Sequence, residues 1–67
     1  MKFELKDDYI ELYKLLKIMD LVDSGGEAKL IISQGYVTKN DIVETKKRAK
    51  IKKGDIIKVA QAVIEVV

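Results

Sequence analysis

The residues of this 67-residue chain that could do chemistry lie in two short stretches, and the first is strongly basic. The stretch KKRAKIKK, residues 46–53, carries six positive charges and no negative one. The rest of the chain has seven basic and eleven acidic residues, which gives it a net charge of −4. Charge sorted into one block favours a polyanionic partner.

The second stretch, SGGEAK over residues 24–29, predicts a helix start that could bind an anion. Ser24 and Glu27 have the spacing of a capping box. The free N–H groups of a helix start attract anions, and Gly25 and Gly26 would let a phosphate approach the backbone. Lys29 should project from the same face. The alternative is that the two glycines only let the chain turn or let two helices cross closely, and the residues alone leave both interpretations open.

Catalytic chemistry has little support in the composition. The chain has no cysteine, so it cannot form a thiolate metal site. It also has no histidine, which is the commonest metal ligand and the commonest general base. The glycines of SGGEAK lack the spacing of a phosphate-binding P-loop. We therefore expect no enzyme activity, no metal and no cofactor. The acidic pair Asp7 and Asp8 is interpreted as stabilising the start of a helix through its dipole.

Two helices are predicted from hydrophobic spacing. The first should begin near residue 9, with Asp7 or Asp8 as its cap, and end near residue 19 or 20. Its apolar face consists of Tyr9, Leu12, Tyr13, Leu16 and Met19, widened by Leu15. Both of its tyrosines are therefore expected in the core. The second helix should run for about ten residues from the capping box to Gly35, which suits a helix C-terminus.

The remaining segments read as strands and turns. A short strand is expected over residues 2–5, and a hairpin at Asn40-Asp41, since both residue types tolerate positive φ angles. The basic block should form a loop anchored by an inward-pointing Ile51. Two further strands, IIKVA and VIEVV, should meet near Gln61, after a turn at residues 54–55. The predicted fold is α+β, with two short helices packed on a small, mostly antiparallel sheet.

The bulk properties suit one small domain over residues 1–67. The apolar fraction of 48% is ordinary for a globular protein. No apolar run is long enough to span a membrane, and no signal-peptide pattern opens the chain. We therefore expect a cytoplasmic protein.

The order of these motifs resembles a known family. A helix followed by SGGEAKLII, SQGYVTKN, VETKKRAKI and KKGDIIKV resembles the RNA-binding domain of the ribosomal protein S-four type, also called the alpha-L motif. The likeness covers about residues 9–59 and is greatest to the small stand-alone YaaA/YbcJ-like branch. That branch has S-G-G-x-A-K where larger relatives have S-R-x-x-A-R.

The resemblance implies a non-enzymatic protein that binds structured RNA, ribosomal or transfer RNA-like, in association with the ribosome and translation. The start of the second helix and the basic block would form the binding face. The expected RNA-binding residues are Ser24, Gly25, Gly26, Lys29, Lys46, Lys47, Arg48, Lys50, Lys52 and Lys53.

Two departures from the family pattern accompany the resemblance. Asn40-Asp41 replaces the usual Asn-Gly, which should strain the hairpin turn a little. Glu11 and Tyr13 stand where many members have Arg and Asp, which removes one expected phosphate contact from the first helix.

A second interpretation is a protein-interaction module that docks an acidic partner on a ribosomal or replication assembly. Salt dependence separates the two, because phosphate contacts weaken steeply with salt whereas a protein interface keeps an apolar component. An enzyme acting on RNA is disfavoured, since larger relatives carry a separate enzyme domain for which this chain has no room. Five of the six basic residues in the block are lysines, which do not favour base-specific readout.

Overall fold

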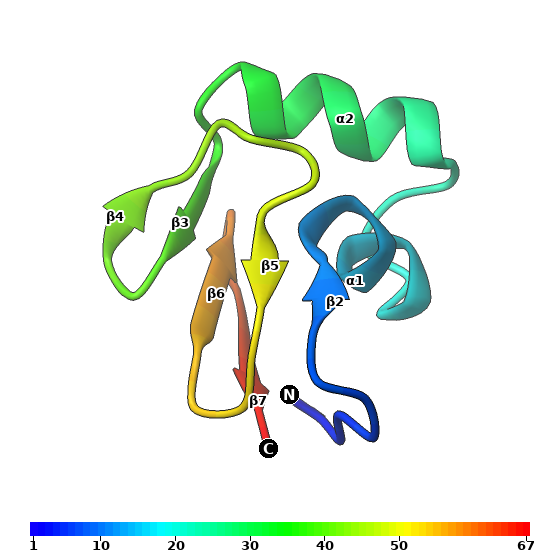
Figure 1. Ribbon diagram of the computed structural model, residues 1–67. Coiled ribbons are helices and arrows are strands. Elements are labelled where there is room, and N and C mark those ends of the chain that lie inside the picture. Colours follow the sequence, from blue (N-terminus) through cyan, green and yellow to red (C-terminus); the bar gives the residue numbers. More distant parts are fainter.

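The computed structural model describes residues 1–67 as two helices and seven short strands (Figure 1). The helices are α1 (Leu12–Ile18) and α2 (Gly25–Ser33). The strands are β1 (Lys2–Phe3), β2 (Ile10–Glu11), β3 (Val37–Lys39), β4 (Ile42–Val43), β5 (Lys50–Ile51), β6 (Ile56–Val59) and β7 (Ala62–Val66). The α+β prediction is confirmed. Neither helix has the length and apolar character needed to cross a membrane.

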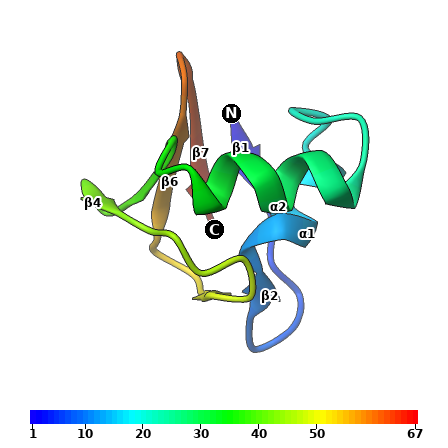
Figure 2. The same cartoon turned by 90° about the horizontal axis from the view of Figure 1, so that it is seen from above.

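The strands form two sheets. The larger has the order β1-β7-β6-β3-β4, in which β1 pairs with β7 in parallel and all other neighbours are antiparallel. A small second sheet pairs β2 with β5, Ile10 opposite Ile51 and Glu11 opposite Lys50. Figure 2 shows α2 lying across the molecule on one side of the larger sheet. The pairing of β2 with β5 was not predicted.

The core is entirely apolar and is shared by helices and strands. Its twelve buried residues are Leu5, Leu12, Leu15, Leu16, Val22, Ala28, Ile32, Val37, Ile51, Ile57, Ile64 and Val66. The predicted stripes of both helices supply part of this set, and Ile51 points inward as expected. Because Ile51 is fully buried, it anchors the basic block, residues 46–53, to the hydrophobic core.

Helix α1 begins later than predicted, and its cap differs. Tyr9 precedes the helix and is 43% exposed, so its predicted place in the helical core stripe is wrong. The first N–H groups of α1, from Leu12 and Tyr13, donate to the carbonyls of Ala49 and Lys47, each at 3.0 Å. The N-cap is Glu11, with no side-chain cap bond. Asp7 and Asp8 therefore do not cap α1, because backbone carbonyls from a distant segment satisfy its free N–H groups.

Helix α2 has both predicted ends. The Ser24 hydroxyl accepts a hydrogen bond from the Glu27 N–H at 3.1 Å, and the Glu27 carboxylate reaches back to the Asp23 N–H at 2.7 Å. At the other end Gly35 has a φ of +83°, and the N–H groups of Gly35 and Tyr36 donate to carbonyls of the last helical turn. This pair of hydrogen bonds defines a Schellman motif.

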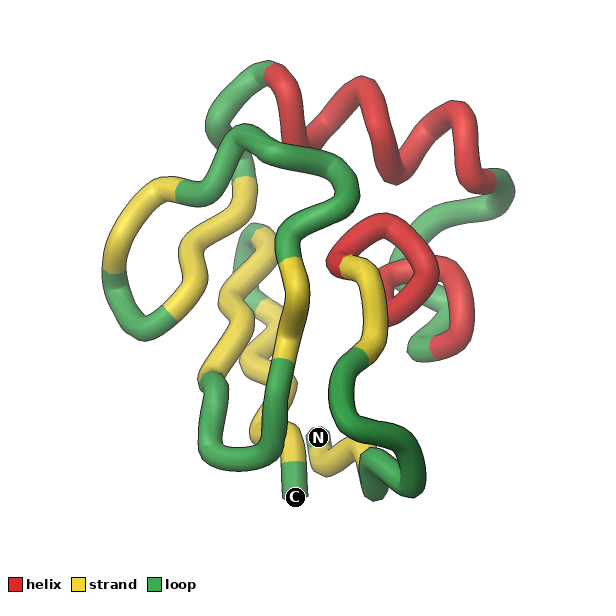
Figure 3. The backbone as a smooth tube through the Cα atoms, viewed as in Figure 1, coloured by secondary structure: helices red, strands yellow, loops and turns green.

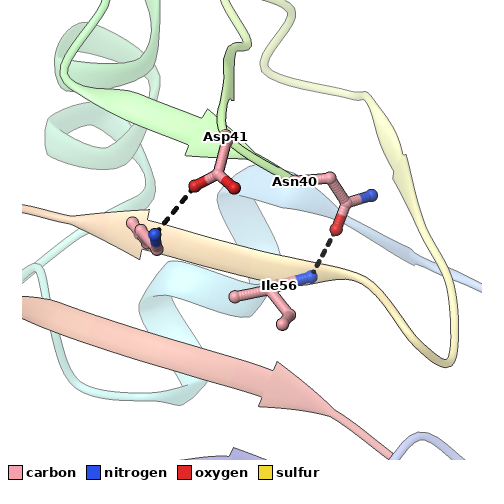
Figure 4. Close-up of polar contacts among 4 residues, drawn as sticks. Asn40, Asp41 and Ile56 are labelled. Atoms are coloured by element: carbon pink, nitrogen blue, oxygen red, sulfur yellow. Dashed lines mark hydrogen bonds and ion pairs between the residues drawn. The ribbon is translucent and has the colours of Figure 1, made fainter.

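The β3–β4 hairpin turns at Asn40 and Asp41, with φ angles of 52° and 69°, as predicted. Its turn is tied to the neighbouring β6 by side chains (Figure 4). The Ile56 N–H donates to the Asn40 side-chain oxygen at 2.9 Å, and the Lys58 ammonium donates to the Asp41 carboxylate at 2.8 Å. These bonds stabilise a conformation that costs a non-glycine residue free energy.

Candidate nucleic-acid interface

The basic loop, residues 46–49, is held against the start of α1 by its own backbone. The carbonyls of Lys47 and Ala49 accept the α1 N–H groups described above, and the Lys46 N–H donates to the Glu44 carboxylate at 3.1 Å. Figure 3 shows this irregular segment passing between α2 and β5. The side chains of Lys46, Lys47 and Arg48 remain exposed. The loop therefore presents three cations from a fixed backbone.

The start of α2 offers free backbone donors. The N–H groups of Gly25 and Gly26 have no acceptor within the protein. An added Cβ would lie 3.9 Å from the Tyr13 ring at Gly25 and 3.8 Å from the Ser24 hydroxyl at Gly26, which are ordinary van der Waals distances. Neither glycine has a positive φ. Helix crossing and chain turning therefore do not require glycine at either position.

Tyr13 lies where these segments meet. The ammonium nitrogen of Lys29 lies 4.9 Å from the centre of its ring, and that of Lys14 lies 5.9 Å from it. The Tyr13 N–H donates a hydrogen bond to the basic loop, and Gly25 of α2 lies against the Tyr13 ring. We call this surface the Tyr13 face: the basic loop, Gly25, Gly26, Lys29, Tyr13 and Lys14. Sequence reasoning assigned Tyr13 only to the core and missed Lys14, although Lys14 follows Tyr13 directly.

Glu11 places a negative charge beside this surface. Its carboxylate lies 3.1 Å from the Lys14 ammonium and 4.0 Å from the Arg48 guanidinium. The hydrogen bond to Glu11 is the main cause that raises the pKa of Lys14 above its ordinary value. Lys14 therefore stays protonated, but Glu11 offsets part of the positive charge.

The structure spreads the remaining predicted contacts over other parts of the surface. Lys50, on β5, lies with its ammonium 5.0 Å from the centre of the Tyr9 ring. Lys52 and Lys53 lie in the turn between β5 and β6, which Figure 1 places near the chain termini and away from α2. The Lys52 N–H donates to the Asp55 carboxylate at 2.8 Å, which fixes that turn. These two lysines are thus separated from the Tyr13 face.

Other polar groups near the site have simpler roles. The Ser33 hydroxyl, in the last turn of α2, donates back to the Leu30 carbonyl at 2.8 Å. Tyr36, between α2 and β3, is 65% exposed and could stack on a base. No three acidic side chains lie close enough together to hold a metal ion.

Comparison with known proteins gives a consistent result. The family model described as the S4 domain matches residues 3–67. The candidate RNA-binding protein YbcJ of Escherichia coli (strain K12) is 39% identical over 62 residues, covering 92% of this chain and 89% of that protein. YbcJ of Shigella flexneri matches with the same values. The solution structure of E. coli YbcJ, described as revealing an alpha-L motif involved in RNA binding, superposes with a TM-score of 0.76 at 39% identity, covering 98% of this chain and 85% of that one.

Proposed function

Because this chain belongs to the S4-domain family, we propose that it is a non-enzymatic RNA-binding protein that recognises folded RNA through the Tyr13 face. The relatives described as RNA-binding support the class of partner. Structured RNA of the ribosomal or transfer RNA type is the proposed target, and a role on or near the ribosome is part of the proposal.

The observation that carries the proposal is the meeting of two donor sets on one surface. The basic loop carries exposed cations on a backbone that hydrogen bonds to α1 hold in place, and the free N–H groups at Gly25 and Gly26 lie beside Lys29. Point charges and backbone donors suit phosphate oxygens, whereas base edges are better read by planar, bidentate groups. Recognition should therefore depend mainly on the shape of the RNA and the path of its phosphates.

The alternative, a module that docks an acidic protein, has one feature in its favour. Tyr36, Ile42 and Val43 are exposed apolar side chains from the segments that precede the basic loop. A protein partner could cover them while pairing with the cations, which would leave an interface that resists salt.

The test is a salt titration of binding to total cellular RNA, with duplex DNA measured in parallel. With about five phosphate contacts, the logarithm of the binding constant should fall with the logarithm of salt concentration with a slope of about −3.5 to −4.5. Tight, salt-sensitive binding that prefers folded RNA supports the proposal. No binding to RNA at low salt would exclude it and favour the protein partner.

A triple variant locates the site. Changing Lys46, Lys47 and Arg48 to alanine should weaken RNA binding by about 100-fold at low salt, because about three phosphate contacts are lost. The control removes three positive charges elsewhere, at Lys2, Lys6 and Lys17, which are all exposed. Equal losses of RNA affinity in the two variants would mean that only the net charge of the protein matters and that the basic loop is not the site.

A further inference from the structure

We propose that Tyr13 is a positioning residue for the RNA site: its ring holds the ammonium groups of Lys29 and Lys14 in place before RNA arrives. The inference rests on the proposed function. Tyr13 is one of the two positions at which the first helix departs from the family pattern. The inference gives this helix a role in RNA binding despite that departure.

The ring itself is well fixed. Tyr13 is half-buried and packs against the hydrophobic core, and its N–H bonds to the Lys47 carbonyl at 3.0 Å. The start of α2 lies against the ring, since an added Cβ at Gly25 would meet the ring carbon Cδ2 at 3.9 Å. A ring that packs on the core and against α2, on a backbone held by the basic loop, is a stable platform for mobile lysines.

Both lysines lie within the range of a cation–π interaction. Their ammonium nitrogens are 4.9 Å (Lys29) and 5.9 Å (Lys14) from the ring centre, and attraction to an aromatic face operates within about 6 Å. Two cations gathered at one place repel each other, and the negative face of the ring offsets that repulsion. Glu11 also holds Lys14, at 3.1 Å, but no carboxylate lies within ion-pair distance of Lys29. Lys29 therefore depends on the ring.

Positioning matters because free lysine side chains lose rotamer freedom when they bind. A lysine that is already restrained over a ring loses less on contact with phosphate, which raises affinity without a new contact. The tyrosine hydroxyl makes no hydrogen bond within the protein. The ring face alone should then suffice, and phenylalanine should replace tyrosine without loss.

The experiment compares Tyr13→Leu with Tyr13→Phe in RNA binding, after thermal unfolding has shown that both fold. Tyr13→Leu should weaken binding by about threefold to tenfold, and Tyr13→Phe should restore it. In a double-mutant cycle, Lys29→Ala should cost less in the Tyr13→Leu background than in the natural one. Additive losses, or a Tyr13→Phe variant as weak as Tyr13→Leu, would overturn the inference.

A second measurement needs no RNA and separates failure of this inference from failure of the proposed function. In the NMR spectrum of the free protein, the ring current of Tyr13 should shift the ε-methylene protons of Lys29 upfield relative to those of Lys53, an exposed lysine in the turn between β5 and β6. Lys29 protons at the ordinary position would overturn the positioning role even if RNA binds. Shifted protons in a protein that binds no RNA would overturn the proposed function alone.

Discussion

Glu11 is the residue that most weakens the positive charge of the proposed RNA site. The family pattern often has arginine at this point, whereas here a carboxylate contacts both Lys14 and Arg48. Its side chain is 21% exposed, so its field is only partly screened by solvent. One acidic residue thus neutralises charge on the α1 side of the Tyr13 face.

We predict that Glu11→Gln strengthens RNA binding by about twofold to fivefold at low salt, because a negative charge near phosphate is removed and two cations are released. Binding isotherms at two salt concentrations test this, and the gain should shrink at the higher one. Glu65→Gln, on an exposed position of β7, is the matched control. A loss of affinity in Glu11→Gln would mean that Glu11 is needed to orient Lys14 and Arg48.

The two glycines at the start of α2 make a second prediction at the residue scale. Gly26→Ala meets no obstacle in the protein and should raise stability by a few tenths of a kcal/mol, up to about 1 kcal/mol, through helix propensity. The same methyl group should lower RNA affinity by keeping phosphate away from the free N–H groups. Thermal unfolding and RNA titration of one sample measure both effects. Higher stability with unchanged affinity would show that close approach of the backbone is not used.

At the scale of elements, local signals predicted local structure. The capping box, the glycine after α2 and the Asn40-Asp41 turn each act within a few residues, and all three were confirmed. The predicted start of α1 was wrong because the carbonyls that cap it belong to Lys47 and Ala49, which come after α2 and the β3–β4 hairpin in the chain. The two-residue strands β2 and β5 are too short to show periodicity.

The site was predictable to a similar degree. The basic block and the glycines were visible as composition, and the family resemblance has been confirmed. The central place of Tyr13 was not visible, because apolar spacing describes which side a residue faces and not which neighbours it meets. Only tertiary structure brings Lys14 and Lys29 to the same ring.

The β6–β7 turn contains a strained residue that sequence patterns did not indicate. Ala60 has a φ of 53°, in a region that costs an alanine free energy. Ala60→Gly should stabilise the fold by about 0.5 to 1 kcal/mol, measured as a higher unfolding temperature. Asp41→Gly should gain less, since it also loses the ion pair with Lys58. A lower unfolding temperature for Ala60→Gly would show that entropy of the unfolded chain outweighs the strain.

At the scale of the whole molecule, the structure separates the lysines at the two ends of the basic block, Lys46 and Lys47 from Lys52 and Lys53. The Tyr13 face adjoins α2, whereas Lys52 and Lys53 lie in the turn near the chain termini (Figure 1). A single RNA helix end that covers the first surface need not reach the second. Removing Lys46 and Lys47 or removing Lys52 and Lys53 costs the same charge, so the two double variants show which place contacts RNA.

We predict that changing Lys46 and Lys47 to alanine reduces affinity and the salt slope more than changing Lys52 and Lys53. The first pair should lower the slope by about 2, because each lost phosphate contact changes it by nearly one. Salt titrations of both double variants against the same RNA give the comparison. Equal slopes would extend the binding surface along β5 to the second pair.

The first and last strands of the chain, β1 and β7, lie side by side in parallel, and Figure 1 places both chain ends on the side of the molecule away from α2. The amino group of Met1 donates to the Val63 carbonyl at 2.8 Å, and the Val67 carbonyl accepts from Leu5 at 2.7 Å. Because the last residue lies away from α2, a flexible linker from it to a second copy would not have to cross the start of α2. Such a tandem could grip two neighbouring sites on one RNA, and its avidity would follow from linker length rather than from any new contact.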